Sequence, residues 1–224
     1  MGTGAVPDAS AIRDADSASR SVGGICQGYV GETSGVRMIK VTWEWLGQGL
    51  ALDLADTVTV EEGIEHDLID SAVEYARWAE REAGFLPDGY AGALEEGRHE
   101  LLGLRTAVRE ALVAVAAGES PPRSAVDRLN AACRSAPSWS ELDPADLSVR
   151  SRTSAREIDA LVALYARSAI DLLANDGNRV RRCPAPSCGM FYASRRRQQR
   201  WCSTQCGTRA RVARHYDSQR RVTS

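Results

Sequence analysis

Four of the six cysteines stand close together late in the sequence, with a spacing typical of a metal site. They are Cys183, Cys188, Cys202 and Cys206, which fall within 24 residues in the pattern C-x4-C-x13-C-x3-C. Two close pairs separated by a loop can surround one tetrahedral ion, with zinc–sulfur bonds about 2.3 Å long. Because a catalytic zinc keeps one position open for water, four thiolates predict a structural Zn²⁺.

Two disulfides in a small secreted module are the alternative explanation for this cluster. The sequence does not favour them, because the N-terminus has neither a basic start nor an apolar signal core. Cys26 and Cys133 lie far from the cluster and from each other. No apolar run approaches the roughly 18 residues that span a bilayer. We therefore expect a cytoplasmic protein with no membrane partner and with reduced thiols that hold the metal.

Charge is distributed very unevenly along the chain. Residues 179–224 hold twelve arginines and a single acid, Asp217, which gives +11, whereas residues 1–178 carry −13. A basic end on an acidic body is typical of nucleic-acid binding, because guanidinium groups neutralise phosphates. The candidate DNA-binding residues are Arg195, Arg196, Arg197, Arg200, Arg209, Arg211 and Arg214. Two alternatives stay open: a solvated face, or a surface that binds the acids of a partner protein.

Aromatic residues are interleaved with these charges. We expect Phe191, Tyr192 and Trp201 to form the small core of the cysteine module rather than to stack on bases. A helix over 203–216 would place Arg211 and Arg214 three residues apart, on a face shared with Thr208. Such a face suits a DNA groove or its phosphates.

The chain before the cysteines predicts a mainly helical body with a small β element. Residues 1–37 are rich in Gly, Ala, Ser and Asp, so we expect a disordered leader. Alternating apolar residues on either side of a glycine break at 47–49 predict two short strands, at 41–45 and 50–54, paired as a hairpin.

Helix signals follow this element. Ser71 and Glu74 form a capping box, Gly118 ends a long core helix, and Ser124 is the expected N-cap of the next one. The predicted helices cover about 71–83, 94–117, 124–133 and 155–174. The apolar face of the first would hold Val73, Ala76, Ala79 and Ala83. Residues 136–153 fit either a loop or short strands.

The polar residues of the body allow two interpretations. Asp53 and Asp56 either bind backbone amides at a turn, which we favour, or line a ligand pocket. In the second case they would surround it together with Arg105 and Arg109. No nucleophile motif and no complete dinucleotide fingerprint is present, so we expect a protein without enzymatic activity rather than an enzyme.

The residues around the cysteines resemble the CGNR zinc-finger family. The resemblance lies in Cys183-Pro-x-Pro-x-Cys188-Gly189, Arg200-Trp201-Cys202-Ser203 and Cys206-Gly207-x-Arg209. Members commonly carry an N-terminal ABATE-type domain, and Leu52-Asp53-x-x-Asp56-Thr57 is similar to the LDxxNT signature of that domain. The resemblance covers about residues 41–215 and implies a treble-clef-like zinc site and a role proposed for the family in stress-induced transcription. Two positions depart from it: Asp56 replaces the signature Asn, and Thr208 replaces the Asn of CGNR.

Together these observations predict an α+β, mainly α protein in three parts: a leader (1–37), an ABATE-like helical body (38–178) and a CGNR-like zinc finger with a basic tail (179–224). The leading hypothesis is a bacterial DNA-binding transcription regulator whose body dimerises or senses a small-molecule effector. The alternative is a small-molecule-binding enzyme or cofactor domain with the finger as a structural lid.

Overall fold

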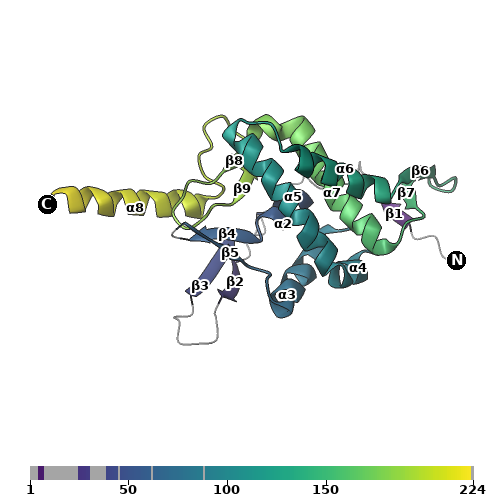
Figure 1. Cartoon of the computed structure of the whole chain (residues 1–224), viewed down its shortest axis with the longest axis horizontal. Coiled ribbons are helices and arrows are strands. Elements are labelled where there is room, and N and C mark those ends of the chain that lie inside the picture. The colour runs from purple at the N-terminus through teal and green to yellow at the C-terminus, as the bar shows by residue number, and fades with distance from the viewer. Residues whose placement is uncertain are drawn as a thin grey trace.

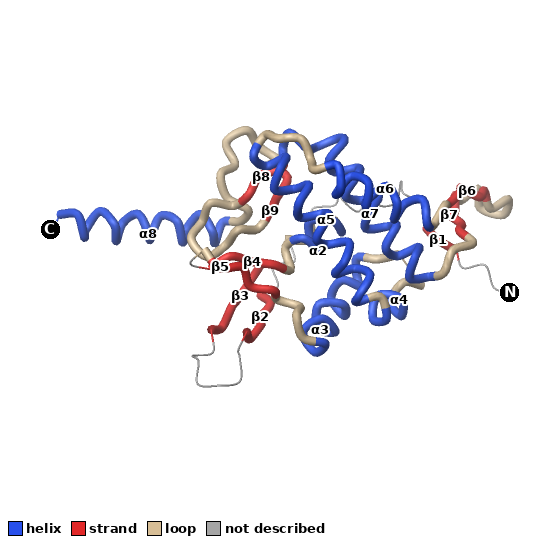
Figure 2. The backbone as a smooth tube through the Cα atoms, in the orientation of Figure 1, coloured by secondary structure: helices blue, strands red, loops and turns tan. Residues whose placement is uncertain are grey.

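The computed structural model describes residues 5–7, 25–30, 39–44, 46–61, 63–87 and 89–222. Within them the chain is mainly helical, with small antiparallel sheets at the edges of a helical core (Figures 1 and 2). The helices are α2 (Leu50–Ala55), α3 (Ala72–Glu82), α4 (Ala91–Glu96), α5 (Arg98–Ala117), α6 (Arg123–Ser135), α7 (Glu157–Asp176) and α8 (Thr204–Val222), with short 3₁₀ turns at Ala83–Phe85 and Gly177–Arg179. The predicted α+β, mainly α class is confirmed.

All strands pair antiparallel. They are β1 (Ala5–Pro7), β2 (Ile25–Val30), β3 (Ile39–Glu44), β4 (Val58–Glu61), β5 (Ile64–Asp67), β6 (Ser138–Leu142), β7 (Val149–Thr153), β8 (Val180–Arg182) and β9 (Phe191–Ala193). The sheet orders are β1-β7-β6, β2-β3, β4-β5 and β8-β9. Residues 136–153 thus form the β6–β7 hairpin, which resolves the choice that the sequence left open.

The core lies between α5 and α7, which are both 20 residues long and pack against each other and against α2 and α6. Leu101, Val108 and Leu112 of α5 belong to the same buried cluster as Leu161 of α7, and each of the four is at most 1% exposed. Full burial of one such side chain contributes about 1.5–3 kcal/mol. Gly118 ends α5 in the left-handed conformation that the sequence predicts, with φ 81°.

The predicted hairpin of 41–45 with 50–54 is wrong. Strand β3 pairs with β2, and Leu50–Ala55 is the helix α2, in which every residue is buried. The alternation of leucines indicated a strand, but a segment that is buried on all sides needs no polar face and no particular period. Trp45 itself lies outside the described residues.

Two strands lie in the segment that we expected to be a disordered leader. Strand β1 is the edge strand beside β7, and β2 is the partner of β3. The partner of β1 is distant in sequence, so local composition gives no sign of β1, whereas β2 pairs with the next strand along the chain. The other residues of 1–37 lie outside the described part of the chain.

Two details of the predicted helices also differ. Ser71 does cap α3 and accepts a hydrogen bond from the amide of Glu74 at 3.1 Å. However, α3 buries Tyr75, Trp78, Ala79 and Glu82, and Val73 on the expected face is 63% exposed. The large aromatic side chains fill the core better than the alanines would. Helix α6 begins after Pro122 rather than after Ser124, because proline suits the entry to a helix.

Candidate metal centre and basic surface

The four clustered cysteines converge in the structure as predicted. Their sulfur atoms all lie within 4.8 Å of one another, and all four residues are buried. Three Sγ–Sγ distances are 3.7 Å for Cys188–Cys202, 3.5 Å for Cys202–Cys206 and 3.6 Å for Cys206–Cys188. A tetrahedron with arms of about 2.3 Å has edges of about 3.8 Å, so the sulfurs fit a zinc ion. The structural Zn²⁺ prediction is confirmed, and the cluster contains no disulfide.

Local backbone geometry brings the cysteines together. The amide of Cys183 donates to the carbonyl of Met190 at 2.8 Å and closes the β8–β9 turn. Within this turn Ser187 (φ 55°) and Gly189 (φ 69°) are left-handed. In the second pair, Cys202 lies just before α8 and Cys206 lies in the first turn of that helix, where its amide donates to the hydroxyl of Ser203 at 3.2 Å. A helix N-terminus also favours the thiolate form that binds metal.

Arg209 forms a hydrogen bond with one of the four clustered cysteines. Its Nη2 donates to Cys206 Sγ at 3.0 Å and its Nη1 to the carbonyl of Ser187 at 3.4 Å. Zinc with four thiolates carries a net charge of −2, which a neighbouring guanidinium partly offsets. Among the seven candidate DNA-binding arginines, Arg209 is therefore the one whose guanidinium is bound to a cysteine of the cluster, although the residue itself is exposed.

The aromatic residues form the predicted small core. Phe191 and Tyr192 are at most 1% exposed, and Trp201 is half-buried. The guanidinium carbons of Arg109 and Arg182 lie 5.8 and 5.9 Å from the centre of the Phe191 ring. The finger core is continuous with the core of the body, because these side chains belong to the same cluster as Leu52 and Leu161.

Buried hydrogen bonds join the body to the finger. Asp56 Oδ1 accepts from the amide of Phe191 at 2.7 Å, and Thr59 Oγ1 donates to the carbonyl of Cys188 at 2.7 Å. The side-chain oxygen of Gln48 accepts from the amide of Ala193 at 3.1 Å. Burial raises the pKa of Asp56 well above its usual value, although the Phe191 bond opposes the shift. Sequence reasoning found Asp56 but gave no role to Thr59 or Gln48, whose partners lie more than 100 residues away.

The four candidate pocket residues do not converge. Asp53 accepts from the amide of Gln48 at 3.4 Å, so both aspartates bind backbone amides, which is the interpretation that we favoured. Arg105 and Arg109 instead line a cavity of about 660 Å³ beside Glu65 and Asp67, to which neither aspartate contributes.

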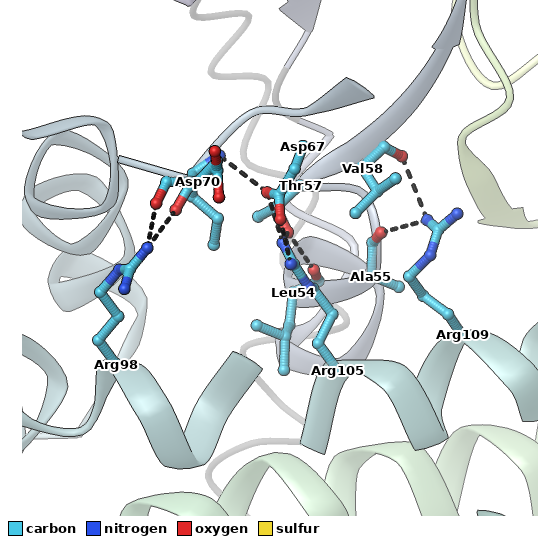
Figure 3. Close-up of polar contacts among 10 residues, drawn as sticks. Leu54, Ala55, Thr57, Val58, Asp67, Asp70, Arg98, Arg105 and Arg109 are labelled. Atoms are coloured by element: carbon cyan, nitrogen blue, oxygen red, sulfur yellow. Dashed lines mark hydrogen bonds and ion pairs between the residues drawn. The ribbon is translucent and has the colours of Figure 1, made fainter. Parts of the chain in front are cut away.

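Arginines of α5 hold the neighbouring segment 54–70 (Figure 3). Arg105 donates to Thr57 Oγ1 and to Asp67 Oδ1, both at 2.8 Å. Arg109 donates to the carbonyls of Ala55 at 2.8 Å and Val58 at 3.2 Å, and to Glu65 Oε1 at 2.7 Å. The i, i+4 spacing of the two arginines was visible in the sequence, but their partners depend on the path of β4 and β5.

The remaining candidate DNA-binding arginines lie on the surface. Arg195, Arg196, Arg197 and Arg200 are exposed, as are Arg211 and Arg214. Arg211 donates to Thr208 Oγ1 at 3.0 Å and Arg214 to the carbonyl of Ala210 at 3.3 Å. Over the described residues, none of the six forms an ion pair with an acid.

These features define a zinc-finger protein with an α-helical body. Comparison with known families agrees: the ABATE family, described as "Putative stress-induced transcription regulator", matches residues 48–176, and the CGNR zinc finger matches residues 179–219. The chain belongs to the ABATE family, with a CGNR zinc finger, as the resemblance predicted. No curated protein matches the chain. Among the described residues, no helix has the length and apolar character needed to cross a membrane.

Proposed function

We propose that this protein is a DNA-binding transcription regulator that contacts DNA through the arginines of its zinc finger. The observation that carries the proposal is the set of six exposed arginines, Arg195, Arg196, Arg197, Arg200, Arg211 and Arg214, without acidic partners in the described chain. An unpaired guanidinium is available to phosphates and guanine edges. The family description points to transcription regulation.

In this proposal zinc acts structurally. It fixes the loop between the cysteine pairs, which carries Arg195–Arg200, and the start of α8, which carries Arg211 and Arg214. The arginines then neutralise phosphates and release counterions from DNA. If about six phosphates are contacted, log affinity should fall against log salt with a slope near −5.

The test is fluorescence anisotropy of the zinc-loaded protein with its own upstream DNA and with a scrambled duplex, across a salt series. A steep slope and preference for the upstream duplex would support a regulator, whereas a slope near zero would sink the proposal. Arg195/Arg196/Arg197→Gln should lower the slope by roughly 3. The matched control is Arg123/Arg152/Arg156→Gln, which removes the same charge from arginines that pair with acids of the body.

The cavity beside α5 is a candidate effector site. It has a volume of about 660 Å³ and is lined by both charged and apolar groups, such as Arg105, Glu110 and Val113. Arg109 lies both in this cavity and over the ring of Phe191 in the finger, so a bound molecule could alter how the finger is seated. Native mass spectrometry of freshly purified protein should reveal a retained small molecule. Val113→Trp should abolish retention, and Val73→Trp on α3 should not; retention by both variants would argue against this site.

Dimerisation, the other predicted role of the body, has a candidate surface on the β6–β7 hairpin. Trp139, Leu142, Leu147 and Val149 are 46–71% exposed there. Exposed apolar groups of this size often mark interfaces between chains. Sedimentation velocity of wild type and Trp139→Ser/Leu147→Ser would test the idea, and a monomeric wild type would reject it.

A further inference from the structure

Helix α8 begins within the metal centre and then leaves the protein. Its first turns are anchored, because Cys206, Gly207 and Ala210 are buried. A Cβ atom added at Gly207 would lie 3.0 Å from Cδ1 of Trp201, so the helix packs directly on that ring. From residue 214 to 220 every side chain is exposed, and Figure 1 shows this part extending away from the body. The protein supports only the first half of α8.

The second half of α8 has little tertiary packing to stabilise its helical conformation. Isolated helices shorter than about 12–15 residues are marginal in water, and most helices in proteins are stabilised by packing of an apolar face. Residues 214–220 bury no side chain, and the large aromatic Tyr216 is 60% exposed. A helix that is polar on all sides bridges to a partner, depends on i, i+4 side-chain pairs or is unstable. Here one such pair is His215 with Gln219, 3.1 Å apart, and a pair of this kind adds only about 0.2–0.5 kcal/mol.

Charge indicates which partner fits. Asp217 is the only acid of α8, and five arginines lie between 209 and 221. At about 100° per residue, Asp217 falls on the side of Ala210 and Ala213, toward the body. The opposite side carries Thr208, Arg211, His215 and Ser218, hydrogen-bonding groups that suit phosphates and base edges. By the same step the other four arginines, Arg209, Arg214, Arg220 and Arg221, lie nearer the Asp217 side. The helix as a whole, with five arginines and one acid, would therefore repel a second copy of itself and attract a polyanion.

The dimensions of α8 fit duplex DNA. The helix has 19 residues, a length of about 28 Å, and the major groove, about 12 Å wide, admits one helix. We propose that residues 211–222 of α8 lie in the major groove of duplex DNA and that the DNA stabilises their helical conformation. This inference rests on the proposed function and adds to it the element that enters the groove.

Hydrogen exchange provides the first test. In the free, zinc-loaded protein the amides of 214–222 should exchange at close to the rate of an unfolded chain, whereas those of α5 and α7 stay protected. Saturating duplex DNA should slow exchange in 214–222 by at least about tenfold, because opening the helix then requires release from the DNA. Unchanged exchange in a complex that demonstrably forms would overturn the inference. Slower exchange at high protein concentration without DNA would also overturn it, since a second copy would then be the partner.

A matched pair of neutral variants provides the second test. Ser218 is exposed and donates only to the carbonyl of His215, at 2.7 Å, so Ser218→Ala and Ser218→Gly lose the same contact. They differ in helix propensity, and if DNA binding requires a formed helix, the Ala variant should bind about fivefold more tightly than the Gly variant. The salt slope should be equal, because no charge changes.

The outcomes separate this inference from the proposed function. Equal affinities of the two Ser218 variants, with a steep salt slope retained, would reject α8 as the groove-binding element and leave DNA binding to the Arg195–Arg200 loop. Absence of any DNA binding would reject the proposed function itself. A fivefold difference with unchanged slope supports both.

Discussion

The arginines of the body and those of the finger surface have opposite surroundings. In the body, Arg105 and Arg109 are 10–12% exposed at the side chain and are bound by Asp67, Glu65 and backbone carbonyls. In the finger, Arg195, Arg196 and Arg197 are exposed and meet no acid within the described chain. The same residue type therefore holds the fold together in one region and, in our proposal, is left available for a partner in the other. Changes in each region should act on different quantities.

The largest effect should come from the metal centre that holds the finger arginines in place. Cys202→Ser should lose zinc and unfold the finger, because metal binding contributes on the order of 10 kcal/mol to folding in such modules. DNA binding should disappear while the helices of the body remain. Zinc content and circular dichroism check this, with Cys133→Ser as the control. Loss of nearly all helicity would mean that the body cannot fold without the finger.

Removal of one arginine of the body should lower the free energy of unfolding without changing DNA binding. Arg105→Ala removes the guanidinium that donates to Asp67 and Thr57 Oγ1, which keep only the Ile69 amide and the Leu54 carbonyl as partners. The expected loss is about 2 kcal/mol, less than for a fully buried pair because the Asp67 side chain is 31% exposed. Urea denaturation measures the loss. A changed salt slope for DNA binding would contradict the claim that the arginines of the body stabilise the fold and take no part in DNA binding.

The contact between the body and the finger includes Asp56, and the stability of the protein should depend on pH through this residue. Burial raises the folded-state pKa of Asp56 above its unfolded value, so its contribution to stability is present below about pH 4 and is lost as pH rises through the folded pKa. Asp56→Asn keeps an oxygen for the Phe191 amide and restores the residue of the family signature. It should be more stable than wild type at pH 7 and no more stable near pH 4, with each unit of pKa difference worth about 1.4 kcal/mol.

Thermal denaturation at several pH values checks this prediction, with exposed Asp70→Asn as the control. A stability difference between wild type and Asp56→Asn that is independent of pH would contradict it. Glu82 is also buried with a raised pKa, so wild type and Asp56→Asn share the part of the pH dependence that Glu82 causes.

The smallest effect on stability should come from the finger surface. Arg195/Arg196/Arg197→Gln should change the free energy of unfolding by less than about 0.5 kcal/mol, because exposed positions without partners contribute little. Chemical denaturation compared with the salt dependence of DNA binding would sharpen the contrast with Arg105→Ala. Destabilisation as large as that of Arg105→Ala would show that the loop arginines hold the fold rather than face a partner.

The sequence revealed the metal centre and the long helices because their signals are local. Cys183 to Cys206 lie within 24 residues, and the apolar period of α5 and α7 continues over 20 residues each. Helix α2 was misassigned because six buried residues show no helical period. The partners of Arg105 could not be predicted, since Thr57 and Asp67 come into reach only when β4 and β5 fold back along α5. Strand β1 had no local signal, because its pairing with β7 spans most of the chain.

The hydrogen bonds that the carbonyl of Cys188 accepts make the fold of the finger depend on the body. The body supplies them through Thr59 Oγ1 and the amide of Val60. A Cβ atom added at Gly189 would lie 2.8 Å from Cγ2 of Val60, so the turn that holds Cys183 and Cys188 packs closely against β4. A finger excised at residue 179 would expose one side of Phe191 and lose both donors. Grafting the finger onto another protein should therefore require that β4 be transferred with it. Substitutions in β4 and in the Cys183–Cys188 turn should accordingly be correlated among related proteins.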